Sequence, residues 1–298
     1  MISIAMTTYN GAQFVQAQLR SILEQTRQPD EIIICDDGSR DDTVNIIRHV
    51  METSGTDRIR LVENEENLGY IRNFYKAISL TKGDYIFLAD QDDIWHREKL
   101  EKSLAIMERT GAAAICTRSR LIDRDGQEMD GNAFIVSVLL ARLKEELGPV
   151  RFFDLVIENV AQGCTYCFTK EVKAYYLALN SQQLIHDHQI MFIASLVGKV
   201  YACAEPMIDY RIHGSNSAGL QENDKNIKVI WKKPKLKPSR VMFLEELNRV
   251  VKVPHVHFYK LLYYLRLPYF LSVWKRRNLS RQLEKALAER GHPNVPRR

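Results

Sequence analysis

Four polar clusters in the first third of the chain have the residue types needed to bind a nucleotide or a metal ion. They are Thr7–Gly11 (TTYNG), Cys35–Ser39 (CDDGS), 64–69 (NEENLG) and Asp90–Asp93 (DQDD). Carboxylates two positions apart after a buried strand can hold Mg²⁺ or Mn²⁺ together with a bound diphosphate, because these cations prefer oxygen ligands. An Asp of CDDGS could bind a base or ribose, and Tyr9 could stack on the base.

Three of the clusters also have a purely structural interpretation. DQDD could cap the helix predicted after it, and CDDGS could form a turn that caps the helix predicted from Asp42. The pair Asn10-Gly11 is a turn signal by itself. Taken singly, the clusters leave both interpretations open.

Hydrophobic periodicity predicts the elements that would position these clusters. The predicted strands are Ile2–Met6, Glu31–Cys35, Ile59–Val62, Tyr85–Ala89 and Ala112–Cys116, and the predicted helices are Phe14–Leu23, Thr43–Val50, Ile71–Leu80 and Glu98–Arg109. Unbroken apolar strands that alternate with helices indicate an α/β fold with a parallel sheet covered on both faces. Such sheets bind ligands at the carboxyl ends of their strands, where the four clusters lie.

The following hundred residues have a less regular pattern. It predicts helices over Phe152–Asn159, Glu171–Leu179 and Asp187–Val197, strands over Cys164–Thr169 and Val200–Ala204, and a loop over Tyr210–Gly219. Asp187 opens its helix after an apolar pair, so it could act as a partly desolvated base or simply cap the helix. His213 lies in a loop rich in Gly, Ser and Asn, where a solvated or packing histidine is the ordinary alternative to a ligand.

In their order along the chain, the motifs resemble the family 2 inverting glycosyltransferases with a GT-A fold. The matching segments are MTTYNG, QTRQPDEIIICDDGSRDDT, NLGYIRNF and GDYIFLADQDDIW, and the later IHDHQ and YRIHGSN extend the resemblance to about residue 219. Four motifs in order make the resemblance specific. It looks closest to bacterial rhamnosyltransferase-like enzymes of surface polysaccharide synthesis. The fold it implies is a Rossmann-like, mostly parallel sheet flanked by helices.

The resemblance also implies roles for single residues. The base and ribose of a nucleotide sugar would be bound by Thr7, Tyr9, Asn10, Asp36 and Asp37, and the diphosphate and donor sugar would lie along Asn67, Gly69 and Arg72. Asp90 would approach the ribose and donor sugar, Asp92 would bind Mn²⁺ or Mg²⁺, and His213 would complete the metal shell or touch the diphosphate. Asp187 would be the general base. The residue before it is His186, where the family has a Glu.

The implied activity is metal-dependent, inverting transfer of a sugar from dTDP-rhamnose or a UDP-hexose. The implied acceptor is a polyprenyl-diphosphate-linked bacterial glycan, such as an O-antigen or capsule repeat unit, so the enzyme would be cytoplasmic and peripheral on the inner face of the cell membrane. A non-catalytic nucleotide-binding or membrane-scaffold protein with a degenerate site remains the alternative. An NAD-type Rossmann enzyme is disfavoured, because TTYNG stands where GxGxxG would be needed.

The net charge of +5 over 298 residues conceals two regions of opposite charge. Residues 1–224 carry 33 acidic and 23 basic side chains, whereas 225–298 carry 4 acidic and 19 basic ones. We therefore predict a glycosyltransferase domain over 1–224, with a nucleotide-binding half (1–110) and an acceptor half (111–224), followed by a basic, aromatic-rich helical extension. This extension favours an anionic membrane surface as partner, with packing on the body as the alternative. No recognised nucleic-acid-binding module accompanies the charge.

Other features of the sequence disfavour further classes of protein. No run of about 18 apolar residues predicts a spanning helix, and the N-terminus has neither the basic region nor the cleavage site of a signal peptide. Five scattered cysteines are typical of free thiols in a reducing cytosol. The pair Cys164-x-x-Cys167 lacks a second pair at finger spacing, which disfavours a zinc or redox role.

Overall fold

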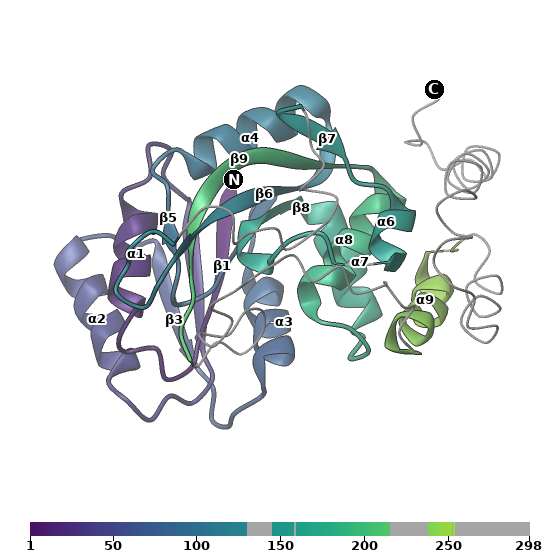
Figure 1. Ribbon diagram of the computed structural model, residues 1–298. Coiled ribbons are helices and arrows are strands. Elements are labelled where there is room, and N and C mark those ends of the chain that lie inside the picture. The colour runs from purple at the N-terminus through teal and green to yellow at the C-terminus, as the bar shows by residue number, and fades with distance from the viewer. Residues whose placement is uncertain (130–144, 158, 215–237, 252, 254–298) are drawn as a thin grey trace.

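A computed structural model describes residues 1–129, 145–157, 159–214, 238–251 and 253. Within them, one mixed sheet has the strand order β3-β2-β1-β4-β8-β6-β9-β5, with β7 paired to β9, and helices cover it (Figure 1). The strands are β1 Ile2–Thr8, β2 Glu31–Asp36, β3 Ile59–Glu63, β4 Tyr85–Ala89, β5 Ile94–Trp95, β6 Ala112–Ile122, β7 Leu147–Pro149, β8 Tyr166–Thr169 and β9 Lys199–Arg211. The helices are α1 Val15–Leu23, α2 Thr43–Ser54, α3 Tyr70–Leu80, α4 Lys99–Thr110, α6 Phe152–Ile157, α7 Lys170–Leu179, α8 His186–Val197 and α9 Pro238–Val250, with a 3₁₀ turn, η2, over Gly163–Thr165.

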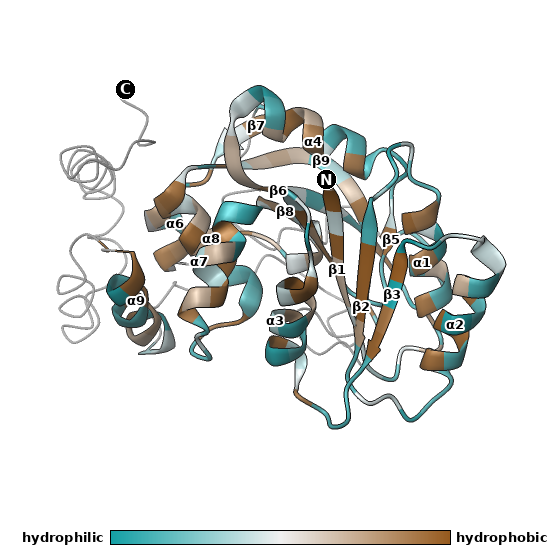
Figure 2. Ribbon diagram, turned by 180° about the vertical axis from the view of Figure 1, so that it is seen from behind, coloured by the Kyte–Doolittle hydropathy of each residue, from teal (hydrophilic) through white to brown (hydrophobic). Residues whose placement is uncertain are grey.

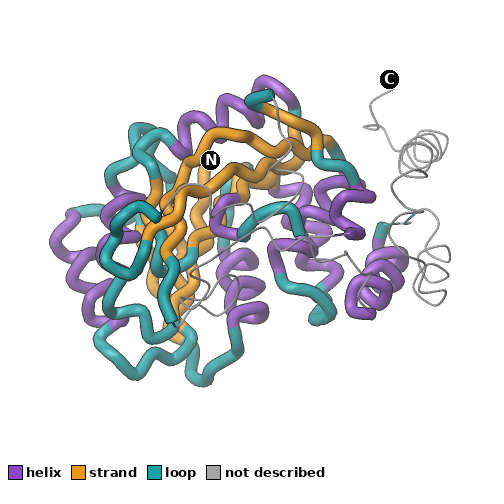
Figure 3. The backbone as a smooth tube through the Cα atoms, in the orientation of Figure 1, coloured by secondary structure: helices purple, strands orange, loops and turns teal. Residues whose placement is uncertain are grey.

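The N-terminal part of the sheet is parallel, as the apolar runs predict. β1 pairs with β2 and with β4, and β2 pairs with β3, in each case in parallel. All seven residues of β1 are buried, because helices cover both faces of a central parallel strand. Figure 3 shows the strands as one layer between helices. The α/β fold predicted from the sequence is confirmed.

The second part of the sheet is mixed, and its strand directions decide which strand ends lie next to one another. β8 runs antiparallel to β4 and to β6, and β6 runs parallel to β9. The amino end of β8, which η2 precedes, therefore lies at the carboxyl end of β4. The carboxyl ends of β6 and β9 lie at the same edge. We call this edge, with the residues that follow β1, β2, β3, β4 and β9 and precede β8, the carboxyl edge.

Strand β9 is longer than the pattern predicts. The sequence suggested a strand over Val200–Ala204 and a loop from Tyr210, but the strand continues to Arg211. The short strand β5 pairs with its end, Ile94 opposite Asp209 and Trp95 opposite Ile208. A two-residue strand has no periodicity to detect, so this pairing could not be predicted from the local sequence.

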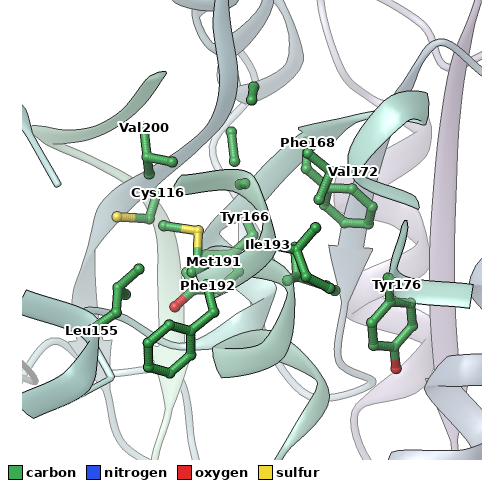
Figure 4. Packing of buried hydrophobic residues seen from close by; sticks show 14 of the residues in the cluster. Cys116, Leu155, Tyr166, Phe168, Val172, Tyr176, Met191, Phe192, Ile193 and Val200 are labelled. Atoms are coloured by element: carbon green, nitrogen blue, oxygen red, sulfur yellow. The ribbon is translucent and has the colours of Figure 1, made fainter. Parts of the chain in front are cut away.

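Two hydrophobic clusters fill the two faces of the sheet. One packs α3, α7 and α8 against it and includes Tyr166, Phe168 and Phe192 (Figure 4). The other packs α1, α2 and α4 on the opposite face and includes Ile4, Leu19 and Ile34. The brown strands and the striped helices of Figure 2 show the same division between apolar interior and polar exterior.

Helix α9, which falls within the predicted basic extension, packs into the first of these clusters. Phe243, Leu244 and Leu247 are fully buried, the Phe243 ring lies 5.5 Å from that of Phe192, and Arg240 Nη1 donates to the Val156 carbonyl at 3.1 Å. The rest of the predicted helical extension, apart from residues 251 and 253, lies outside the described residues. Among the helices that the structure describes, none has the length and apolar character to span a membrane.

Candidate active site

The CDDGS motif forms a hydrogen-bonded turn after β2. Asp36 accepts from Thr8 Oγ1 at 2.7 Å, from Ser39 Oγ at 2.6 Å and from the Ser39 amide at 2.8 Å. Thr8 and Asp36 are partners in the parallel register of β1 and β2. The Asp36 carboxylate thus ties the end of β1 to the turn that follows β2, and Thr7 is buried beside it.

Asp37 organises the loop before α3. Its carboxylate accepts from the amides of Leu68 and Gly69 at 2.8 and 2.9 Å and from Asn64 Nδ2 at 2.8 Å, and its carbonyl accepts from Asn67 Nδ2 at 3.1 Å. Gly69 has φ +79°, a left-handed conformation that favours glycine. The structure therefore brings Asp36, Asp37, Asn67 and Gly69 to one edge, with both carboxylates engaged in shaping the loops.

The TTYNG loop is fastened to DQDD by Gln91. Its Oε1 accepts from the Tyr9 amide at 2.8 Å and its Nε2 donates to the Tyr9 carbonyl at 3.1 Å. Asn10 has φ +49°, and its Oδ1 accepts from the Arg40 amide at 2.8 Å. The Tyr9 side chain remains exposed, as does Arg72 in the first turn of α3. An exposed ring and an exposed cation at the carboxyl edge are suited to a base and a phosphate.

Asp92 and His213 meet although 121 positions separate them. His213 Nε2 lies 2.8 Å from Asp92 Oδ2, and both side chains are largely buried. Arg211, at the end of β9, donates from Nε to the Asp92 carbonyl at 2.9 Å and from its amide to Asp93 Oδ1 at 3.2 Å. The pairing of β5 with β9 thus places the late histidine beside the strand-end aspartate.

A second group of candidate ligands includes the residues on either side of Gln91 and Asp92. Ligand atoms of Asp90, Asp93 and Cys164 lie within 4.8 Å of one another, and Asp93 Oδ2 is buried without a hydrogen-bond partner. Burial, together with the charges of Asp92 and Asp187, raises the pKa of Asp90 to about 7. Burial and the charges of Asp92 and Asp90 hold the pKa of Asp93 well above its usual range. Beneath them Lys99 Nζ donates to the Cys164 carbonyl at 3.1 Å.

These two groups differ in their fit to a hard divalent cation. Asp92 and His213 offer an ionisable carboxylate and an imidazole nitrogen 2.8 Å apart, a donor set that Mn²⁺ accepts. The thiol of Cys164 is kept protonated, because burial and the charges of Asp93 and Asp90 raise its pKa well above the usual value. A neutral thiol is a poor ligand for Mg²⁺ or Mn²⁺. The residues present therefore fit a cation at Asp92 and His213.

Asp187 lies in the first turn of α8 and is buried. Its Oδ2 accepts from Asn159 Nδ2 at 3.0 Å, and its Oδ1 accepts from the His188 amide at 2.5 Å. Burial raises the pKa of Asp187 to about 7, although hydrogen bonds from His188, Asn159 and Gly163 favour its ionised form. The negative charge of Asp187 contributes to the raised pKa of Asp90. The structure thus brings Asp187 to the same electrostatic environment as DQDD.

His186, which stands where the family has a Glu, packs as an aromatic ring. It stacks on Phe74 with ring centroids 3.9 Å apart, and its edge meets Tyr70 at 6.5 Å. Burial lowers the pKa of His186 to about 3, so the imidazole is neutral at physiological pH. No negative charge therefore stands directly before Asp187 in the chain.

Several functional neighbours were not predicted from the sequence. Asn159 and Gly163 hydrogen-bond Asp187, and Gln91 hydrogen-bonds Tyr9. Gly163 also packs closely on the base, because a Cβ at this position would lie 3.1 Å from Asp187 Cβ. The sequence suggested a helix through Asn159, but α6 ends at Ile157 and leaves that asparagine in the following segment. A lone Asn or Gly in such a segment carries no motif, so only the fold could reveal these contacts.

Comparison with known proteins identifies the family. The family model described as Glycosyl transferase family 2 matches residues 3–168, more than half of the chain. The chain belongs to family 2 of the glycosyltransferases. The matched region includes β1, β2, β4 and DQDD, and thus most of the site.

Relatives and solved structures agree with this assignment. The transferase is 28% identical to the dTDP-rhamnosyl transferase RfbG of Shigella flexneri, over 72% of this chain and 73% of RfbG. It is 35% identical to WfaP of Escherichia coli, a UDP-Glc:α-D-GlcNAc-diphosphoundecaprenol β-1,3-glucosyltransferase, over 36% of this chain and 41% of WfaP. The structure of S. aureus TarS with UDP-GlcNAc superposes with a TM-score of 0.59 at 15% identity, covering 84% of this chain and 67% of that one. This likeness confirms the GT-A fold.

Proposed function

We propose that this transferase moves a sugar from a nucleoside-diphosphate donor to a hydroxyl of a bacterial surface glycan, with inversion at the anomeric carbon and with Mn²⁺ or Mg²⁺ as cofactor. Asp187 is the observation that carries the proposal. It is a buried carboxylate with a pKa near 7, held by Asn159, and its charge reaches Asp90. A base tuned to neutral pH beside strand-end carboxylates is the arrangement that such a transfer requires.

In the proposed step, Asp187 accepts the proton of the acceptor hydroxyl while the hydroxyl oxygen bonds to the anomeric carbon. The bond between that carbon and the diphosphate oxygen breaks, and the nucleoside diphosphate leaves with the bonding electrons. Attack opposite the leaving group inverts the configuration. A positioned base of this kind contributes about 10²–10⁴-fold to the rate.

Asp92 and His213 would hold the cation. When bound, it would neutralise the charge that develops on the leaving diphosphate. Arg211 supports this group, because it hydrogen-bonds the Asp92 carbonyl and the Asp93 carboxylate. The exposed Tyr9 ring would stack on the base. Arg72, exposed one turn from Gly69, would pair with the diphosphate.

The donor is dTDP-rhamnose or a UDP-hexose, and the acceptor is a glycan linked to polyprenyl diphosphate, such as an O-antigen or capsule repeat unit. The names of RfbG and WfaP support both choices. Such an acceptor is membrane-bound, so we place the enzyme at the inner face of the cell membrane. The basic residues of 225–298 would bring it to anionic lipid.

A donor panel tests the proposal. The full-length chain is incubated with Mn²⁺ and, separately, dTDP-rhamnose, UDP-glucose, UDP-galactose and UDP-N-acetylglucosamine, and nucleoside diphosphate release is measured. Slow, metal-dependent release from one donor is expected. Asp187→Ala should abolish transfer yet bind that donor and Mn²⁺ in calorimetry. Failure of the wild type to bind any donor would contradict the proposal and favour a scaffold.

A separate experiment tests the membrane component. Because α9 packs into the core, the truncation is placed after Val253 rather than before the helix. The full chain should pellet with vesicles containing phosphatidylglycerol at physiological salt, and the truncated chain should remain in the supernatant. Equal pelleting of the two chains would reject this component without affecting the transfer reaction.

A further inference from the structure

Among the described Phe, Tyr and Trp residues, two side chains are exposed, and both lie at the carboxyl edge. Tyr9 is 43% exposed and Tyr70 is 42% exposed. Tyr9 follows β1, and its backbone is held by Gln91 of DQDD. Tyr70 opens α3 and contacts His186, the residue before Asp187. One exposed ring thus stands beside the metal-binding motif and the other beside the base.

The Tyr70 ring is held by a row of aromatic rings that leads from the core to the surface. Phe74 is buried and stacks on His186 with centroids 3.9 Å apart and an interplanar angle of 21°. His186 in turn meets Tyr70 edge-on, at 6.5 Å and 71°. The Gly69 amide donates to Asp37, which fixes the backbone just before Tyr70. A ring fixed in this way loses little conformational entropy when a ligand covers it.

On the side that faces Asp187, Tyr70 contacts an uncharged residue. His186 is neutral because burial lowers its pKa. The pKa of Tyr70 is raised by burial and by the charge of Asp187, so the phenol is protonated and lies close enough to Asp187 to sense it. A neutral aromatic face beside the Asp187 carboxylate suits a molecule with one apolar face and a hydroxyl at its edge. A sugar ring in its chair form has both.

We propose that Tyr70 forms the acceptor subsite, its ring covering the apolar C–H face of the sugar that carries the attacked hydroxyl and holding that hydroxyl at Asp187. This inference rests on the proposed function and deepens it, because it names the residue that binds the acceptor sugar next to the base. The site then has two aromatic ends, Tyr9 for the donor base and Tyr70 for the acceptor sugar.

Alkyl glycosides test this subsite in the full-length protein. Octyl glycosides of glucose, N-acetylglucosamine and rhamnose serve as acceptors, with the donor found in the panel and Mn²⁺ present. Tyr70→Ala should raise the acceptor KM by about tenfold, the size of an aromatic contact of 1.4 kcal/mol. Tyr70→Phe keeps the ring and should restore the KM to within about twofold of the wild type.

The donor Kd, measured by calorimetry in the same variants, separates this role from the rest of the site. A rise in acceptor KM that exceeds any rise in donor Kd supports the subsite. An unchanged acceptor KM in Tyr70→Ala, an equal rise in both constants, or a wild type that releases nucleotide from its donor yet accepts none of the glycosides would overturn it. Failure of the proposed function is distinguishable, since the wild type would then bind no donor.

Discussion

The amide of Asn159 donates to Asp187 Oδ2 at 3.0 Å, and it is itself held by Tyr166. The Tyr166 hydroxyl lies 3.0 Å from Asn159 Oδ1 and 2.7 Å from the Ala161 carbonyl. Because an ionised carboxylate can only accept, the Asn159 NH₂ group must face it, which leaves Asn159 Oδ1 toward the Tyr166 hydroxyl. The base is thus oriented from β8, through a residue with no charge of its own.

Replacing Asn159 should slow transfer and shift its pH dependence. Asn159→Ala removes a hydrogen bond to the ionised form of Asp187, so the pKa of the base should rise further above 7. The acid limb of the kcat profile should then move to higher pH, and kcat at pH 7 should fall roughly 10-fold or more. Asn45→Ala, which removes a surface amide on α2, should change neither. An unshifted pH profile would show that Asn159 does not position the base.

Asp187→Asn should alter activity and stability in opposite directions. Transfer should be lost, and in the wild type it should fall as pH drops through about 7, because the base becomes protonated. The pKa of Asp187 is higher in the folded than in the unfolded chain, so the contribution of Asp187 to wild-type stability is greatest below the unfolded pKa near 4 and decreases as pH rises toward 7. An asparagine at this position does not ionise, so it causes no such loss of stability at higher pH. Melting curves should therefore show a gain for Asp187→Asn over the wild type that is larger at pH 8 than at pH 5.

The part of the site that could be predicted from the sequence is the part encoded locally. Strands β1, β2 and β4 are continuous apolar runs, and each ends in polar residues that the parallel arrangement brings to one edge. DQDD and CDDGS therefore lie where the pattern places them. The role assigned to Asp187 followed from the family resemblance and stays a prediction. The charge of Asp187 contributes, after burial and the charge of Asp92, to the raised pKa of Asp90.

The remaining contacts depend on strand order, which no local pattern specifies. Cys164 meets Asp90 because β8 runs antiparallel to β4, and His213 meets Asp92 because β9 continues to Arg211 along β5. Lys99 was indistinguishable from a surface lysine of an amphipathic helix, yet its ammonium is buried at the Cys164 carbonyl. Tertiary packing thus decides which polar residues of similar local sequence enter the site.

His213→Ala should weaken metal binding more than nucleotide binding. His213 Nε2 lies 2.8 Å from Asp92 Oδ2, and its ring lies against Phe14 with centroids 4.7 Å apart. We expect the Kd for Mn²⁺, measured with nucleoside diphosphate present, to rise about 10-fold or more, as for loss of a ligand or its supporting partner. His49→Ala on the exposed face of α2 is the matched control. Equal Mn²⁺ affinity in both variants would remove His213 from the metal site.

Gln91 and Gly11 should act as one unit in donor binding. A Cβ at Gly11 would lie 2.2 Å from Gln91 Oε1, so Gly11→Ala must displace the side chain that holds Tyr9. Gln91→Ala removes the same two hydrogen bonds directly. Each variant should raise the donor Kd, and the double variant should be no worse than the poorer single one, because both lose the same contact. Additive effects in calorimetry would show that Gly11 and Gln91 act independently.

Asp209 should contribute to stability in a way that depends on pH and on its burial. Its carboxylate pairs with Arg120 Nε and Nη2 at 2.7 Å each and with His96 Nε2 at 2.7 Å. Burial alone would raise its pKa, but the hydrogen bonds and charges of His96 and Arg120 lower it to about 2. A lowered pKa in the folded state means that the stabilisation is complete above the ordinary value near 4 and is lost as pH falls toward 2. Because Arg120 is partly exposed, Asp209→Asn should cost about 1–2 kcal/mol at pH 7.

The exposed ion pair of Asp84 provides the comparison. Hydrogen bonds from Lys170 and the N-terminal amine, together with their charges, also lower the pKa of Asp84 to about 2, but its side chain is 47% exposed. Solvent screens such a pair, so Asp84→Asn should shift the melting temperature less than Asp209→Asn does, and 1 M salt should remove most of its effect. Thermal melts of both variants from pH 7 to pH 3 measure this. A larger or equally salt-resistant loss in Asp84→Asn would show that burial does not decide the strength of these two pairs.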